Sequence, residues 1–211
     1  MSKVLIFDTE TTGLIPKHTT VLADWPHIVQ LSCIFINLDK LDEMFVDNFI
    51  INPGVLIPKE SADIHGITNE IAEDKGINIQ GALLSFAYFL ENADIIVAHN
   101  LNFDKRIIET ELKRMGYPNV FNTKPRQIYD TMKKGTNMCN IMRTGKGGRQ
   151  YKKFPKLSEL YEHLFKPKVD CCEYKNAHNA IYDVIMTLRC YLKMNEIETE
   201  IDFDKLYRSY L

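Results

Sequence analysis

KVLIFDTETTGL, residues 3–14, is the stretch that decides the fold. Its apolar core, Val4 to Phe7, predicts a buried strand that ends in two acids, Asp8 and Glu10. Side chains two residues apart on a strand leave the same face, so these carboxylates repel each other unless a cation lies between them. Hard divalent cations with oxygen ligands meet that need. A lone D-x-E at a solvated strand end is the alternative.

Two further segments place acids where strands or loops meet helices. In VAHNLNFD, residues 97–104, an apolar strand runs into His99, and Asp104 falls in the first turn of the next helix. Such strand-to-helix crevices bind ligands in α/β sheets. Taken alone, Asp104 is better explained as a first-turn acid favoured by the helix dipole.

The third segment is AHNAIYD, residues 177–183. On one ideal helix, His178 and Asp183 would point roughly 140° apart. To share a site, His178 must lie on the approach to the helix and Asp183 in its early turns. Taken alone, His178 is explained as a surface or capping residue.

Outward from these segments, hydrophobic periodicity predicts the remaining elements. Strands are expected over Lys3–Thr9, His27–Asn37, Glu43–Asn52, Ala93–Ala98 and Gln127–Thr131. Helices are expected from a cap at Thr68 through Asp74, and over Ile79–Leu90, Asn102–Met115, Leu157–Phe165 and Asn179–Met194. The Gly- and Lys-rich stretch Lys133–Pro155 is interpreted as a long loop. Three strands followed by alternating helices and strands predict one α/β domain, residues 1–211, with a mixed sheet and a short extension over about residues 195–211.

Composition narrows the class of protein. The chain has 211 residues, 45% of them hydrophobic and 26% charged, which is typical of one globular domain. No apolar run approaches the roughly 18 residues of a membrane span, and a strand begins too early for a cleaved signal peptide. Five cysteines without a C-x-x-C pair do not indicate a disulfide framework. We therefore expect an intracellular protein, cytoplasmic or nuclear, neither secreted nor in a membrane. A zinc site is a remote alternative, because its adjacent cysteines lack the usual ligand spacing; its members would be Cys139, His163, Cys171 and Cys172.

The net charge of −2 conceals a strong polarity. Residues 112–156 hold twelve Lys and Arg against one acid, Asp130, which gives 12 − 1 = +11, so the remainder carries 14 − 27 = −13. A basic segment of this kind can hold a polyanion while acids elsewhere hold metal ions. A solvated loop is the alternative reading.

Taken together, FDTETTG, HNLNFD and HNAIYD occur in an order and span that resemble the DEDDh (DnaQ-like) 3′–5′ exonuclease family. IHGIT at 64–68 and YDT at 129–131 extend the resemblance, which covers residues 4 to about 193. It implies a ribonuclease H-like fold with a central mixed sheet flanked by helices. It also implies two divalent cations, Mg²⁺ with Mn²⁺ able to substitute.

The resemblance assigns a role to each signature residue. Asp8 bridges both metals, Glu10 and Asp183 complete the ion that holds the attacking water, and Asp104 reaches the second ion. A metal pair suits phosphodiester hydrolysis, which needs hydroxide at neutral pH and relief of charge on the leaving oxygen. His178 is the expected general base. Tyr182 receives no role.

A closed end to the cleft would make the enzyme specific for a terminus. Leu14 and Ile64 are candidates to sandwich the last base, with His65 at its sugar or phosphate, and Phe103 stacks on a neighbouring base. Core packing is the alternative for Leu14 and Phe103. The other substrate-binding candidates are Thr11, Thr12 and Gly13 through backbone N–H groups, Asn100, and the phosphate-gripping Lys146, Arg149, Lys152 and Lys153.

The predicted function is metal-dependent 3′–5′ exonuclease activity on DNA, of proofreading or repair type, which releases 5′-mononucleotides. The substrate is expected to be single-stranded with a free 3′ end. An exoribonuclease of the same family is one alternative, because no residue declares recognition of the 2′-hydroxyl. A nucleic-acid-binding module without chemistry is another. A polymerase or other protein partner cannot be identified from these residues.

Overall fold

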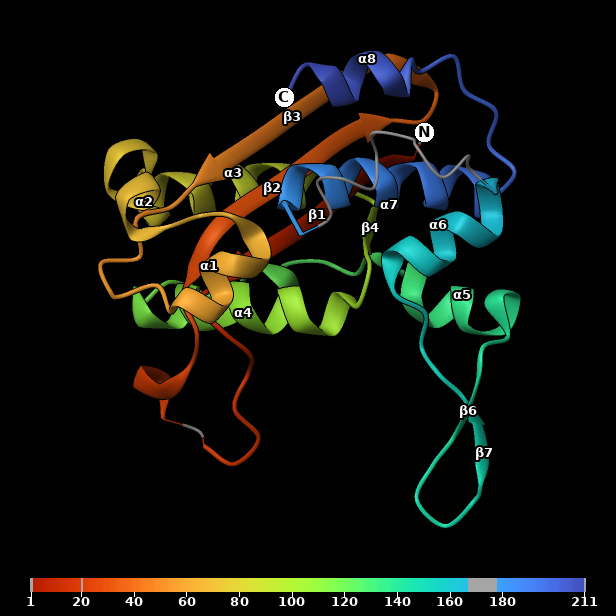
Figure 1. The fold of residues 1–211 in the computed structure, drawn as a ribbon. Coiled ribbons are helices and arrows are strands. Elements are labelled where there is room, and N and C mark those ends of the chain that lie inside the picture. The colour runs from red at the N-terminus through yellow and green to blue at the C-terminus, as the bar shows by residue number, and fades with distance from the viewer. Residues whose placement is uncertain (1, 20, 167–177, 211) are drawn as a thin grey trace.

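The computed structural model describes residues 2–19, 21–166 and 178–210. Its centre is a five-stranded sheet in the order β3-β2-β1-β4-β5 (Figure 1). The strands are β1 (Lys3–Thr11), β2 (Ile28–Asn37), β3 (Lys40–Ile50), β4 (Ile95–Ala98) and β5 (Gln127–Asp130). β1, β2 and β3 form an antiparallel meander, whereas β4 and β5 run parallel to β1. The predicted mixed sheet is therefore confirmed.

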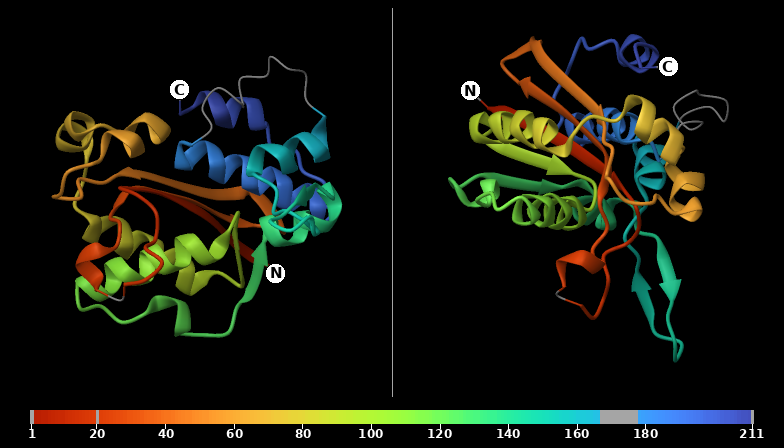
Figure 2. Two further views of the ribbon diagram at one scale, coloured as in Figure 1. Left: turned by 60° about the horizontal axis from the view of Figure 1, so that its bottom comes forward. Right: turned by 90° about the vertical axis from the view of Figure 1, so that its left-hand side faces the viewer.

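Helices cover both faces of this sheet (Figure 2). They are α1 (Lys59–His65), α2 (Asn69–Lys75), α3 (Ile79–Asn92), α4 (Leu101–Arg114), α5 (Thr131–Cys139), α6 (Leu157–Phe165), α7 (Ala180–Met194) and α8 (Phe203–Arg208), with short 3-10 turns η1 (Leu22–Asp24) and η2 (Val120–Asn122). α3 and α4 lie on one face and α7 on the other, so the sheet separates two apolar cores.

Alternation along β1 assigns its side chains to these two cores. Leu5 and Phe7 are fully buried on the α3–α4 side, whereas Val4 and Ile6 are fully buried on the α7 side. Because the alternation continues, Asp8 and Glu10 leave the strand toward α7. β1 is two residues longer than predicted, so Glu10 still belongs to the ladder, opposite Gln30 of β2.

The prediction of a loop over residues 133–155 is wrong for its first part and incomplete for the rest. α5 begins there because Asp130 caps it, its carboxylate accepting the N–H groups of Met132 and Lys133. Gly135 lets α5 approach α6, since a Cβ atom at that position would meet Leu160 at 2.7 Å. A two-stranded hairpin follows, β6 (Met142–Thr144) and β7 (Gln150–Lys152). Weak local periodicity concealed both elements because neither buries a full apolar face.

Two further helices were absent from the sequence prediction, α1 and α8. α8 lies in the extension after α7, and it buries Phe203 and Tyr207 in the α7 core, where the Tyr207 ring stacks on Tyr182 at 5.6 Å. No helix among the described residues is both long and apolar enough to cross a membrane.

Candidate active site

Three of the four predicted metal ligands converge in the structure. Carboxylate oxygens of Asp8, Glu10 and Asp183 all lie within 4.8 Å of one another, and each side chain is half-buried. The first two come from the end of β1, and the third from the first turn of α7. The cluster is therefore reachable from solvent but is built on rigid elements.

Asp104 approaches the same strand from the opposite side. Its buried carboxylate accepts two hydrogen bonds from Thr9, one from the backbone N–H at 3.0 Å and one from the hydroxyl at 2.8 Å. Thr9 lies between Asp8 and Glu10 in the chain, so it fixes Asp104 of α4 against β1. Asp104 stands outside the three-carboxylate cluster, yet its charge raises the pKa of Asp8.

The four acids together form a partly buried, strongly acidic group. Burial, above all, raises the pKa of Asp8, that of Glu10 to about 9, and those of Asp104 and Asp183 to about 7. Neighbouring carboxylates raise the first two further. Within the described ranges, none of the four forms an ion pair with Lys or Arg. An all-oxygen donor set of this charge fits hard divalent cations.

The approach to α7 has the geometry that the sequence required. His178 precedes the helix with a φ of 72°, Asn179 caps it, and the helix itself begins at Ala180. The backbone N–H of His178 donates to the Asp183 carboxylate. The imidazole and the carboxylate therefore belong to one turn without sharing a helix face.

Gln30 anchors this turn to the sheet. Its side-chain oxygen accepts the Ala180 N–H at 3.0 Å, and its amide donates to Asn179 Oδ1 at 3.0 Å and to Asn48 Oδ1 at 2.8 Å. Gln30 is almost completely buried. Gln30 and Thr9 are not among the residues predicted from the sequence, although each is a polar side chain inside an apolar strand, which was the available signal.

A hollow of about 450 Å³, here called the His65 hollow, is lined in part by His178, whose backbone N–H donates to the Asp183 carboxylate. Its lining residues are Ile50, Asp63, Ile64, His65, Gly66, Ile67, Ile71, Lys75, His178 and Asn179. The structure thus brings the predicted base-sandwiching residue, the predicted sugar ligand and the predicted general base to one hollow. The His65 ring is buried, and its Nδ1 accepts the Ile67 N–H at 3.1 Å.

The loop after β1 lies against α1 on the rim of this region. Ser61 of α1 donates its hydroxyl to the Thr12 carbonyl at 3.0 Å. Leu14 is 85% exposed and Ile64 is 58% exposed, so core packing does not explain either side chain. Thr12 donates its own N–H to the His27 carbonyl at 2.9 Å, which removes that N–H from the groups free to bind a 3′ end.

Other predicted substrate residues have structural partners. Thr11 donates its hydroxyl to the carbonyl of Gly13 at 2.6 Å, and the backbone N–H of Asn100 donates to Asp130. Phe103 is half-buried against the α3–α4 core, which supports its alternative reading as a packing residue.

The predicted phosphate-binding residues divide into two groups. Lys146 and Arg149 are exposed at the hairpin tip. Lys152 donates to Asn137 at 3.2 Å, and Lys153 donates to Glu159 at 2.6 Å. The second pair therefore ties the hairpin to α5 and α6.

His99 is a third residue whose position only the structure reveals. Its Nδ1 lies 3.0 Å from Thr131 Oγ1 and its Nε2 lies 3.1 Å from the Pro155 carbonyl. The ring therefore joins the end of β4 to the start of α5 and to the chain just after β7. Of the alternative zinc ligands, Cys171 and Cys172 lie outside the described residues.

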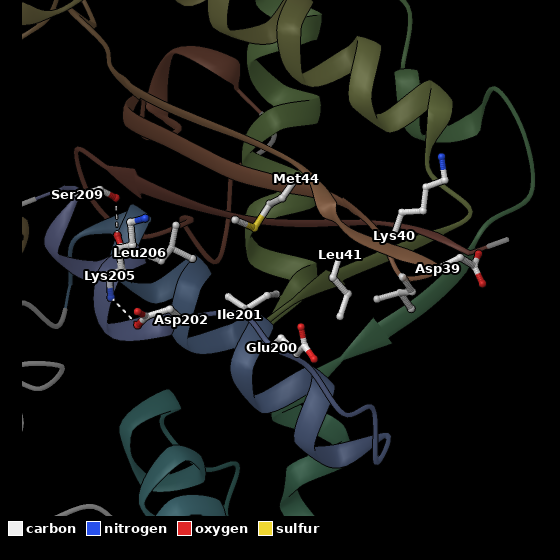
Figure 3. A pocket seen from close by; sticks show the side chains of 11 residues that line it. Asp39, Lys40, Leu41, Met44, Glu200, Ile201, Asp202, Lys205, Leu206 and Ser209 are labelled. Carbon is white, nitrogen blue, oxygen red and sulfur yellow. Dashed lines mark hydrogen bonds between the residues drawn. The ribbon is translucent and has the colours of Figure 1, made fainter.

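A second hollow has a volume of about 880 Å³ (Figure 3). It has an apolar floor that includes Leu41, Met44 and Leu206, and it opens between the β2–β3 turn and α8. Lys3 at the start of β1 pairs with Asn37 beside that turn, whereas the acids stand at the other end of β1. The two hollows therefore lie at opposite ends of the sheet.

The mixed sheet, its two helical layers and the acids at the end of β1 define an RNase H-like nuclease that uses divalent metals. The family model described as Exonuclease (RNase_T) matches residues 5–191. The chain therefore belongs to the exonuclease family, in its DEDDh branch of 3′–5′ exonucleases.

Known relatives and structures agree with this assignment. DNA polymerase III subunit epsilon of Buchnera aphidicola subsp. Schizaphis graminum (strain Sg) is 29% identical over 210 residues, 96% of this chain and 78% of that protein. E. coli exonuclease I in complex with a 5cy-dA13 oligonucleotide matches with a TM-score of 0.66 at 19% identity, over 99% of this chain but 43% of the other. Exonuclease X in complex with 5′ overhanging duplex DNA matches with a TM-score of 0.58 at 22% identity, over 92% of both chains. At these identities the two structures support the fold alone.

Proposed function

We propose that this protein removes 5′-mononucleotides from the 3′ end of DNA, with Mg²⁺ as its physiological cation and Mn²⁺ as a substitute. The observation that carries the proposal is the convergence of Asp8, Glu10 and Asp183 beside the His65 hollow. DNA is favoured over RNA because subunit epsilon, a DNA polymerase subunit by its name, is similar over 96% of this chain. We also propose an intracellular location, where DNA with free 3′ ends occurs. A polymerase partner is compatible with this function.

The proposed mechanism gives each acid a task. Asp8 would contact both cations, Glu10 and Asp183 would complete the coordination of one, and Asp104 would reach the other while Thr9 holds it. When bound, the two cations supply hydroxide at neutral pH and offset charge on the leaving 3′ oxygen. His178 would accept the proton of the attacking water.

The His65 hollow would accept the terminal nucleotide. Leu14 and Ile64 offer exposed apolar surface for a base, and His65 would contact the sugar from inside the hollow. Gly13, Thr11 and Asn100 stand near the ends of β1 and β4, and would contact the terminal hydroxyl and phosphate. A cleft closed in this way accepts an end and excludes an internal bond.

The test is digestion of 3′- and 5′-labelled single-stranded DNA and RNA with Mg²⁺, against an EDTA control. We expect 5′-mononucleotides from the 3′ end of DNA and no cleavage of a closed single-stranded circle. Asp183→Ala should abolish cleavage. His178→Ala should lower the rate roughly 10²- to 10⁴-fold while metal binding persists. Asp204→Ala, on the exposed side of α8, is the matched control and should keep the wild-type rate.

Two results would overturn the proposal. One is Mg²⁺-dependent cleavage of the circle at the rate of the linear strand. The other is an Asp183→Ala protein that is folded and keeps more than a tenth of the wild-type rate. Faster digestion of RNA than of DNA would refute the DNA preference and leave the exonuclease chemistry in place.

A further inference from the structure

The hairpin Met142–Lys152, here called the arm, projects from the body of the molecule (Figure 1). It leaves from the same end as the β1–β2 loop, as the side view also shows (Figure 2). His99 holds the chain on both sides of the arm through Thr131 and Pro155, and His99 follows β4 directly. The base of the arm is therefore fixed to the sheet five residues before Asp104.

The order of the strands places the arm opposite the His65 hollow. The hollow lies at the β2–β3 side of the sheet, where Ile50 of β3 lines it, and the arm follows β5 at the other side. β1, which carries Asp8 and Glu10, stands between them. A strand whose last nucleotide enters the hollow and whose next bonds cross the carboxylates must continue toward the arm.

The charge of the arm region has one sign. Residues 131–156 hold eight Lys and Arg and no Asp or Glu. Among the described residues, Arg143, Lys146 and Arg149 of the arm form no ion pair with an acid. Their side chains are exposed and remain available for phosphates.

The register of the arm sorts its side chains into two faces. Met142 pairs with Lys152, and Arg143 pairs with Tyr151. Because Lys152 reaches Asn137 of α5, its face turns toward the body, so the Arg143–Tyr151 face turns away. Tyr151 is 51% exposed, and a Cβ atom on Gly145 would lie 3.4 Å from its ring, so the ring rests over that glycine. The arm thus presents an aromatic face beside a guanidinium.

We propose that the arm binds single-stranded nucleic acid on the 5′ side of the scissile phosphate, with Tyr151 stacked on an unpaired base and Arg143 and Arg149 on the flanking phosphates. This inference rests on the proposed function for the direction of the strand. Basic side chains interleaved with exposed aromatics are the chemistry that holds single strands without sequence preference. A base inside a duplex has both faces covered by the neighbouring base pairs and offers none to Tyr151, so the arm favours unpaired substrates.

Binding without catalysis tests this inference first. The probe is a fluorescent 12-nucleotide DNA strand in EDTA, followed by anisotropy at several salt concentrations. Tyr151→Ala should raise Kd roughly 5- to 100-fold, as loss of one stacked base does, and Tyr151→Trp should keep wild-type affinity. Replacing both Arg143 and Arg149 by Ala should flatten the salt dependence of log Kd by about 1.4, or about 0.7 per phosphate. Lys205→Ala at the distant hollow is the matched control.

Strand length supplies the second readout. In steady-state digestion, the ratio of KM for Tyr151→Ala to wild-type KM should grow from a dinucleotide to the 12-nucleotide strand. Unchanged Kd and unchanged salt dependence in the arm variants would overturn the inference and make the arm a solvated hairpin. Equal affinity for a blunt duplex would overturn its preference for unpaired bases. Failure of the wild-type enzyme to digest any strand would instead refute the proposed function, since the anisotropy needs no hydrolysis.

Discussion

At the scale of single residues, the hydroxyl of Thr9 influences the pKa of Asp104, which approaches β1 from α4. Its O–H and N–H bonds lower the pKa of Asp104, against the burial that raises it to about 7. As a proposed metal ligand, Asp104 would have to be ionised to hold a cation, so protons would compete with metal at this position near neutral pH.

We predict that Thr9→Val, which keeps the shape and the backbone bond, raises the pKa of Asp104 further. The Mg²⁺ concentration for half-maximal rate should rise roughly 10- to 100-fold at pH 7, the worth of a hydrogen bond to a charged group. The defect should shrink as pH rises, because the acid then ionises without help. Thr9→Ser should behave as wild type. An unaltered Mg²⁺ dependence in Thr9→Val, measured by metal titration of the rate, would show that the hydroxyl has no such role.

At the scale of elements, the start of α7 is the part that the chemistry depends on most. Apolar cores on both faces of the sheet hold the rest of the fold together, whereas the turn that carries His178 is joined to the sheet by the hydrogen bonds of Gln30. His178 precedes α7 and Asp183 lies in its first turn. A small shift at the start of this helix therefore moves the predicted base and a predicted ligand together.

Replacement of Gln30 by Leu should therefore cost activity beyond its cost in stability. We expect a loss of about 1–3 kcal/mol in the free energy of unfolding, because the Ala180 N–H loses its acceptor. At saturating Mg²⁺, kcat should also fall roughly 10- to 100-fold through misplacement of the turn. Ser32→Ala removes a buried hydrogen bond to Asn48 of β3 but leaves the bonds of Gln30 to Asn179 and Ala180 in place, so it should lower stability and leave kcat alone. Equal kcat for the two variants would show that Gln30 is only structural.

At the scale of the whole molecule, the four acids link stability to pH and metal. Each has a pKa that folding raises, to about 7 for Asp104 and Asp183 and to about 9 for Glu10. The folded chain therefore binds more protons than the unfolded chain above about pH 4, so its metal-free stability decreases as pH rises toward 9. A bound cation would replace those protons and prevent the loss of stability at high pH.

Thermal unfolding in EDTA should show this decline directly. We expect Tm to fall by about 5–10 °C between pH 5 and pH 9, and Mg²⁺ to raise Tm more at pH 9 than at pH 5. Glu10→Gln should reduce the slope, whereas Glu73→Gln on the exposed side of α2 should leave it as in wild type. A metal-free Tm that rises over this range would contradict the electrostatics of the site.

Local sequence patterns determined the strands, most helices and the identity of the acids. Three of these patterns each extend over about ten residues or fewer, so they can be recognised in the sequence: the apolar run before Asp8, the cap at Thr68 and the periodicity of α6. The structure places all three as predicted. The spacing of His178 and Asp183 also sufficed to place one before α7 and the other within it.

Only the tertiary structure decided which partners those residues meet. Thr9 and Asp104 are 95 residues apart, and Gln30 and Ala180 are 150 apart, so no local period links them. α5 depends on a cap and on close packing of Gly135 against Leu160, and the arm takes its place from the two bonds of His99. Periodicity reports which face of an element is apolar, but a hydrogen bond between distant segments arises only when the core has brought them together.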